Sequence, residues 1–137
     1  MANPTAHDKF TAPSLIGHGV PAVLGLLYLV AAVLAIRHGG ATAALPATLI
    51  VVGGLLPVLA HFSFHHRSRP AWAFLISICG VFAVVEFFGA PKLRSTLGIP
   101  LEVTMILPAL NALAVTMLVT MRDQYVDRAA PAARRAV

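Results

Sequence analysis

The chain has 137 residues, of which 58% are hydrophobic and only 11% are charged, and its formal net charge is +5. So few polar residues cannot cover the surface of a soluble globule of this size. The composition therefore excludes an ordinary soluble protein and indicates one compact domain embedded in a lipid bilayer.

Four apolar runs are long enough to cross a membrane as helices, for which about 20 residues are needed. We expect these spans at about residues 14–36, 44–64, 71–90 and 101–121. The predicted fold is therefore an all-α integral membrane protein whose four transmembrane helices form an up-down bundle. A polar segment at residues 1–13 precedes the bundle, and a basic tail at residues 122–137 follows it.

The first span begins at Ser14, a residue type suited to a helix N-cap, and stops at the sequence RHGG. The small residues 41–43 that follow resemble a signal-peptidase site, which leaves cleavage as an alternative. However, the apolar run is longer than the roughly 7 to 15 residues of a signal peptide, and Arg37 interrupts the approach to the site. We therefore expect the first span to be retained.

The second span ends in the sequence HFSFHH, residues 61–66, followed by Arg67 and Arg69. This motif resembles one histidine box of the membrane di-iron hydroxylases and desaturases, in which clustered imidazoles hold two irons. That family gathers more histidines than the six of this chain, so the resemblance does not lead to a di-iron prediction. His61, His65 and His66 remain candidate metal ligands, and their simplest interpretation is a basic patch at the membrane interface.

Two histidines lie within spans, where ionisable groups are costly and usually face the bundle interior. His18 and His61 are each about seven residues from the middle of their span, on the same predicted side. We expect the two side chains to approach each other. They are either neutral packing residues bonded to backbone carbonyl groups or, alternatively, ligands of a haem or a single metal ion.

A second polar layer is predicted nearer the other face of the membrane. Glu86 sits in the apolar sequence VVEFF, whereas Glu102 lies in the first turn of its helix and can reach water. We expect Glu86 to be a buried, neutral carboxylic acid near pH 7, because a charge at this depth costs a few kcal/mol. Its candidate hydrogen-bond partners are Asn111, Thr104 and Tyr28.

The sequence contains few other residues or motifs that indicate a chemical function. The only cysteine, Cys79, lies within an apolar run and is expected to be a small core residue. No phosphate-binding loop, serine-hydrolase elbow or paired-cysteine motif is present in the sequence. No cofactor is predicted, and the basic residues, which sit in loops and ends, indicate contact with anionic lipid rather than with nucleic acid.

Function stays open at this point, and the simplest hypothesis is a non-catalytic accessory or assembly subunit that contacts other membrane subunits or itself. A first alternative is an enzyme acting on an apolar, isoprenoid-like substrate, with Glu86 as acid or base and Asn111 or Tyr28 orienting the substrate. A second is a small proton-linked carrier between the two polar layers. A third is a haem-bearing redox anchor that uses His18 and His61.

The distribution of basic residues predicts a multi-pass protein of the cell membrane with both termini in the cytoplasm. Seven basic residues fall on the side of the termini and three on the other side, and the positive-inside rule places the richer side in the cytoplasm. The three are Arg37, Lys92 and Arg94.

This orientation can be tested by labelling. A cysteine at position 95, introduced as Ser95→Cys in a Cys79→Ala background, should react with a membrane-impermeant maleimide added from outside the cell. Modification from the cytoplasmic side alone would reverse the predicted orientation.

Overall fold

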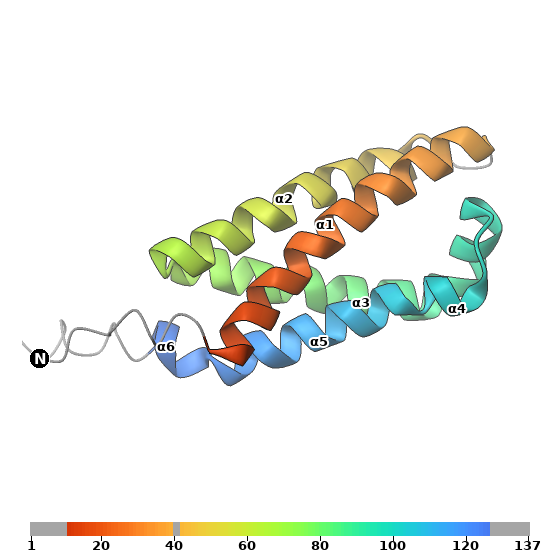
Figure 1. Ribbon diagram of the computed structural model, residues 1–137. Coiled ribbons are helices and arrows are strands. Elements are labelled where there is room, and N and C mark those ends of the chain that lie inside the picture. Colours follow the sequence, from red (N-terminus) through yellow and green to blue (C-terminus); the bar gives the residue numbers. More distant parts are fainter. Residues whose placement is uncertain (1–10, 40–41, 127–137) are drawn as a thin grey trace, which may run out of the picture.

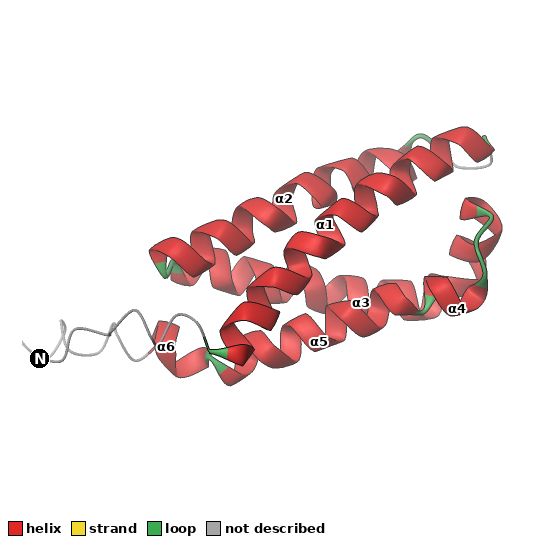
Figure 2. Cartoon of the chain, viewed as in Figure 1, coloured by secondary structure: helices red, strands yellow, loops and turns green. Residues whose placement is uncertain are grey.

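The computed structural model describes residues 11–39 and 42–126, and all regular structure in this part of the chain is helical (Figures 1 and 2). The elements are α1 (Ala12–His38), α2 (Ala44–His66), α3 (Arg69–Leu97), α4 (Leu101–Thr104), α5 (Ile106–Thr120) and α6 (Arg122–Val126). Most of the two predicted terminal segments, including Lys9 and three of the tail arginines, lies outside the described residues.

Four helices in the described part of the chain are long and apolar enough to cross a membrane: α1, α2, α3 and the continuous stretch Leu101–Thr120. They pack together as a bundle in which successive helices alternate in direction (Figure 1). This arrangement supports the prediction of a small polytopic membrane protein. We call the end that carries α6 the α6 end, and the end that carries α4 the α4 end.

The most extensive helix pair is α1 with α2, and glycine makes its close approach possible. A methyl group added at Gly25 would lie 2.6 Å from the carbonyl oxygen of Gly53 and 2.7 Å from Cδ of Pro57. A methyl group at Gly53 would in turn lie 2.9 Å from the Gly25 carbonyl oxygen. The backbones of the two helices therefore touch at this crossing, where no side chain fits between them.

Helix α3 extends well beyond the predicted span, which was expected to close at Gly89 and Pro91. It continues to Leu97, so that most of the expected connector is helical. Pro91 removes only one backbone hydrogen bond and keeps a helical φ, and its exposed position allows the freed carbonyl group to be solvated. The helix ends instead at Gly98, whose φ of 67° is the left-handed conformation that terminates helices.

The fourth span is interrupted once, between α4 and α5 at Met105. The cause is Pro108, which has no N–H to donate to the carbonyl oxygen of Thr104 four residues earlier. Met105 keeps right-handed helical angles, so the two helices continue along one path. The span therefore crosses the bundle as a single rod with one missing backbone bond.

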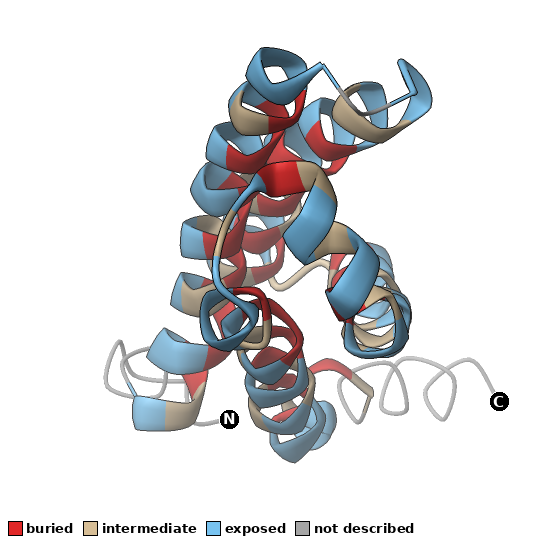
Figure 3. Cartoon of the chain, turned by 90° about the vertical axis from the view of Figure 1, so that its right-hand side faces the viewer, coloured by how far each residue is buried: buried red, intermediate tan, exposed pale blue. Residues whose placement is uncertain are grey.

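Buried residues face the middle of the bundle, and the outward faces are exposed and apolar (Figure 3). The largest core side chains include Leu24, Leu56, Leu75 and Leu118. Large exposed side chains such as Phe88 lie on the outside. An apolar outer surface is what contact with lipid requires, because lipid chains are as apolar as the side chains themselves.

The glycine crossing gives a test of the packing. Gly25→Ala should lower the free energy of unfolding by about 1 to 3 kcal/mol, since the added methyl group overlaps the backbone of α2. Gly54→Ala is the matched control, because a methyl group there meets open space. Unfolding in mixed detergent micelles, followed by circular dichroism, measures both variants. Equal stability of the two variants would contradict the crossing.

Candidate functional site

Three buried polar side chains from three helices meet in the core: Glu86 of α3, Asn111 of α5 and Tyr28 of α1. Asn111 Nδ2 donates to the Tyr28 hydroxyl oxygen over 2.6 Å and to Glu86 Oε2 over 2.9 Å. The Tyr28 hydroxyl group also lies close to the Glu86 carboxyl group. We call these three residues the Glu86 cluster, and it is the group that the sequence predicted around Glu86.

The protons of the Glu86 cluster can be assigned from its donors. The Tyr28 oxygen accepts from Asn111, which leaves the Tyr28 hydroxyl proton free to point toward the nearby Glu86 carboxyl group. Glu86 therefore accepts a hydrogen bond from the Asn111 amide, and the Tyr28 O–H is a second donor close by. Asn111 Oδ1 is buried and has no hydrogen-bond partner among the described residues, which gives the cluster one unused acceptor.

The other polar residues predicted for this layer lie elsewhere. Thr104 is buried, but its hydroxyl group donates to the carbonyl oxygen of Leu101 in its own helix over 2.7 Å. The prediction of Thr104 as a partner of Glu86 is therefore wrong. Glu102 is exposed at the start of α4, as expected for a charge in the first turn of a helix.

A cavity of about 510 Å³ opens beside the Glu86 cluster toward the α4 end. Its walls come from α1, α2, α3 and α5, and Glu86 is part of the lining. The apolar walls include Leu49, Phe82 and Leu107, and Lys92 lies near the mouth. The remaining lining residues are Ala31, Thr42, Leu45, Thr48, Val85, Gly89, Leu93 and Thr96.

The two ionisable residues that line the cavity both belong to α3 and differ in burial. Glu86 and Lys92 are six residues apart, which corresponds to about 9 Å along a helix axis. Glu86 is buried, and Lys92 is exposed. The cavity thus joins a buried carboxyl group to a cationic mouth through apolar walls, and its volume is within the range of roughly 300 to 1,000 Å³ typical of small-molecule sites.

A second buried polar group lies toward the α6 end and contains His18, Ser63 and Tyr125, here called the His18 cluster. His18 Nδ1 lies 2.7 Å from the carbonyl oxygen of Ser14 and must donate to it. His18 Nε2 lies 2.9 Å from Ser63 Oγ and 3.0 Å from the Tyr125 hydroxyl oxygen. The Tyr125 hydroxyl also donates to the Ser63 carbonyl oxygen over 3.1 Å.

One assignment satisfies this cluster without any charge. His18 donates from Nδ1 and accepts at Nε2 from the Ser63 hydroxyl, while Tyr125 donates to the Ser63 carbonyl group. His18 thus matches the interpretation of a neutral packing residue bonded to a backbone carbonyl. The carbonyl group that accepts from His18 belongs to Ser14, four residues earlier in the same helix.

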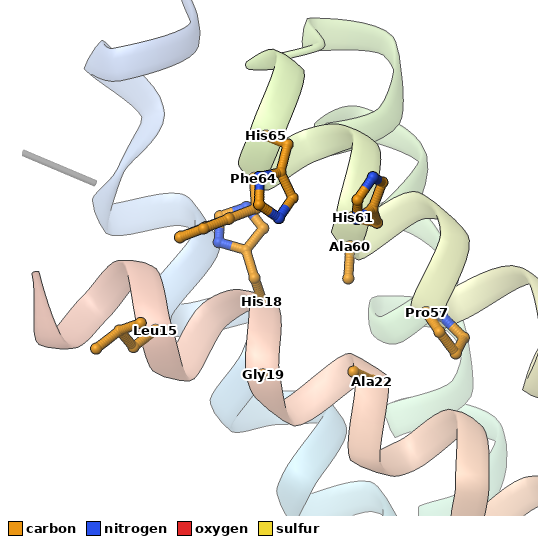
Figure 4. A pocket seen from close by; sticks show the side chains of 9 residues that line it. All are labelled: Leu15, His18, Gly19, Ala22, Pro57, Ala60, His61, Phe64 and His65. Carbon is orange, nitrogen blue, oxygen red and sulfur yellow. The ribbon is translucent and has the colours of Figure 1, made fainter. Parts of the chain in front are cut away.

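His61 lies differently from its prediction. Its side chain is exposed, and its ring contacts are with Phe62, His65 and His66 of its own helix. The buried side of α2 carries Ser63, which is two residues or about 200° further around the helix. His61 and His18 border the same open hollow between α1 and α2 (Figure 4), but the prediction that His61 faces the bundle interior is wrong.

The structure also shows where the predicted candidate ligands of a haem or a metal ion lie. Both ring nitrogens of His18 are used in hydrogen bonds, so an axial bond to haem would require breaking one of them. Within residues 11–39 and 42–126, no three His, Cys, Asp or Glu side chains are grouped so that they could hold a metal ion together. Cys79 is buried in the core, as expected.

Tyr125 is the site residue that the sequence did not reveal, because it lies in a charged segment that was expected to be a tail. Its ring stacks on Trp72 with centroids 5.3 Å apart, and Trp72 Nε1 donates to the carbonyl oxygen of Leu118. The guanidinium group of Arg67 also lies over the Tyr125 ring, with its Cζ atom 5.8 Å from the ring centroid. The aromatic residue in a polar tail was the available signal, since tyrosine anchors helices at membrane interfaces.

Comparison with known proteins adds no assignment. No family model matches the sequence, and searches of curated proteins and of solved structures found no match either.

Removal of one hydroxyl group tests the His18 cluster. Tyr125→Phe keeps the stacked ring but loses the hydrogen bond from the Tyr125 hydroxyl to the Ser63 carbonyl oxygen, and should cost about 1 kcal/mol. Thr116→Val is the control, because it removes an exposed hydroxyl that bonds only to Ala112 of its own helix. Unfolding followed by the fluorescence of Trp72, the only tryptophan, compares them. Equal losses would contradict a stabilising role for the cluster.

Proposed function

We propose that the protein binds a small amphipathic molecule from the bilayer in the cavity beside Glu86. The observation that carries this proposal is a buried carboxyl group on the wall of an otherwise largely apolar cavity. Ionisable groups at membrane depth are expensive and commonly mark binding sites or transport pathways. Glu86 is also held in place by Asn111 and Tyr28, as a recognition group must be.

The lining suggests the chemistry of the ligand. Its body is apolar, to match Leu49, Phe82 and Leu107, and it carries one polar group that exchanges a hydrogen bond with Glu86. At the mouth, Lys92 would attract a polar or anionic head at the level of the lipid headgroups. An isoprenoid or fatty molecule with a polar end fits this pattern.

Acid–base catalysis on such a molecule is a second candidate, and the proximity of the Tyr28 hydroxyl group to Glu86 favours it. This contact places a phenol proton next to a carboxyl group at the end of an apolar cavity. Glu86 would act as acid or base, and Asn111 would orient the substrate. Glu86→Gln separates the two candidates, because it should largely preserve binding yet abolish proton transfer.

The other hypotheses draw less support from the contacts. An accessory subunit would use the exposed apolar faces to meet a partner, but apart from Asn111 Oδ1 the polar groups of both clusters already bond within the chain. A proton carrier needs polar groups between the two clusters. The buried residues of α1 between them are Pro21, Leu24 and Gly25, none of which can carry a proton.

Filling the cavity tests the proposed function. Gly89 lines the cavity, and a side chain built on it meets open space, so Gly89→Leu should fill the cavity without disturbing the helix. Protein extracted in a mild detergent would be analysed by native mass spectrometry for bound small molecules. We expect the wild type to retain an amphipathic species and Gly89→Leu to lose at least about nine-tenths of it.

Gly80→Leu is the matched control, since Gly80 lies on the same helix with open space at its Cβ but does not line the cavity. It should retain the bound species as the wild type does. If Gly89→Leu held the same species at the same occupancy, the cavity would not be the binding site.

A further inference from the structure

The outer surface of α2 carries a pair of exposed histidines near the α6 end, far along the helix from the Glu86 cavity. His61 and His65 border a hollow of about 270 Å³ between α1 and α2 (Figure 4). Apart from His18, its other walls are apolar, with Leu15, Ala22 and Pro57 among them. Neither histidine has a role in the His18 cluster or in the cavity.

The spacing of the pair is that of a helical metal chelate. Residues four apart lie on one helix face, and two histidines at this spacing provide two ligands to zinc in metalloproteases. The ring centroids of His61 and His65 are 4.5 Å apart, with an interplanar angle of 41°. Two imidazoles bound side by side to one ion at about 2.1 Å from nitrogen have ring centres about 4.5 to 5 Å apart.

From this geometry we propose that His61 and His65 chelate a divalent transition-metal ion of the kind that prefers imidazole, such as Cu²⁺, Ni²⁺ or Zn²⁺. The site is independent of the proposed ligand cavity. Because no third His, Cys, Asp or Glu within the described residues completes the set, water or a lipid phosphate oxygen fills the remaining coordination positions. The site is therefore an open, exchangeable one.

Neighbouring groups define the limits of the site. His18, on α1 across the hollow, uses both ring nitrogens in hydrogen bonds and is no ligand. His66 packs its ring on Phe62, and its centroid is 6.2 Å from that of His61, further than His65. Arg67 is the nearest cation along the chain, and its screened repulsion lowers the affinity at low salt.

Copper binding tests the proposal directly. Full-length protein without a polyhistidine tag, purified in detergent, would be titrated with Cu²⁺ and followed by electron paramagnetic resonance. We expect one equivalent of bound copper whose spectrum shows couplings to two imidazole nitrogens. His61→Ala and His65→Ala should each weaken binding at least about tenfold, since even losses outside the coordination shell cost 10- to 100-fold.

His66→Ala is the matched control, because it removes an exposed imidazole from the same helix turn. It should leave both the affinity and the spectrum unchanged. The proposal is overturned if His66→Ala weakens copper binding as much as His61→Ala does, or if His61→Ala and His65→Ala bind as the wild type does. Circular dichroism of all three variants should be identical, since none of these side chains is buried.

Discussion

The bundle depends on one constraint: each polar group buried among apolar helices must find its hydrogen-bond partner on another helix or in its own backbone. Two clusters, one on each side of the glycine crossing, satisfy their buried polar groups in this way, with Asn111 Oδ1 as the exception. The Glu86 cluster joins α1, α3 and α5, and the His18 cluster joins α1, α2 and α6. Because α1 belongs to both, it is the helix through which the other spans are aligned.

The packing between the clusters explains where the cavity lies. At Gly25 and Gly53 the backbones of α1 and α2 are in contact, which draws these two helices together near the middle of the bundle. Toward the α4 end, larger residues of α2 such as Leu45 and Leu49 line the space between the helices, and α3 lies opposite them. The space left between the four spans is the cavity, and Glu86 borders it from α3.

Much of this could be predicted from the sequence, because an apolar span has few polar residues and therefore few possible partners. This is why Asn111 and Tyr28 were placed correctly beside Glu86 from their depth, although the same reasoning wrongly added Thr104. The prediction that His61 faces the bundle interior failed for the opposite reason, since Ser63 occupies that position. Neighbouring polar residues of α2 compete for the same partner, and helical rotation, fixed by contacts with α1 and α6, decides between them.

Features that depend on contacts between distant residues could not be predicted from the sequence pattern. The continuation of α3 through Pro91 depends on an exposed position, which composition does not reveal. The burial of Tyr125 depends on its stacking with Trp72, more than fifty residues away in the chain. A cavity is the space that packed side chains leave unfilled, so it emerges only once all the helices are placed.

The acidic side chain of Glu86 supports a role in ligand binding rather than a purely structural role. An amide such as glutamine would accept the same hydrogen bond from Asn111 and could never take on a charge, which is costly at membrane depth. A cluster that served packing alone would therefore gain nothing from an acid. The acid lies on the cavity wall, whereas the other two members are fully buried and outside the lining. The member of the cluster that can exchange a proton is thus the one that a molecule in the cavity would meet.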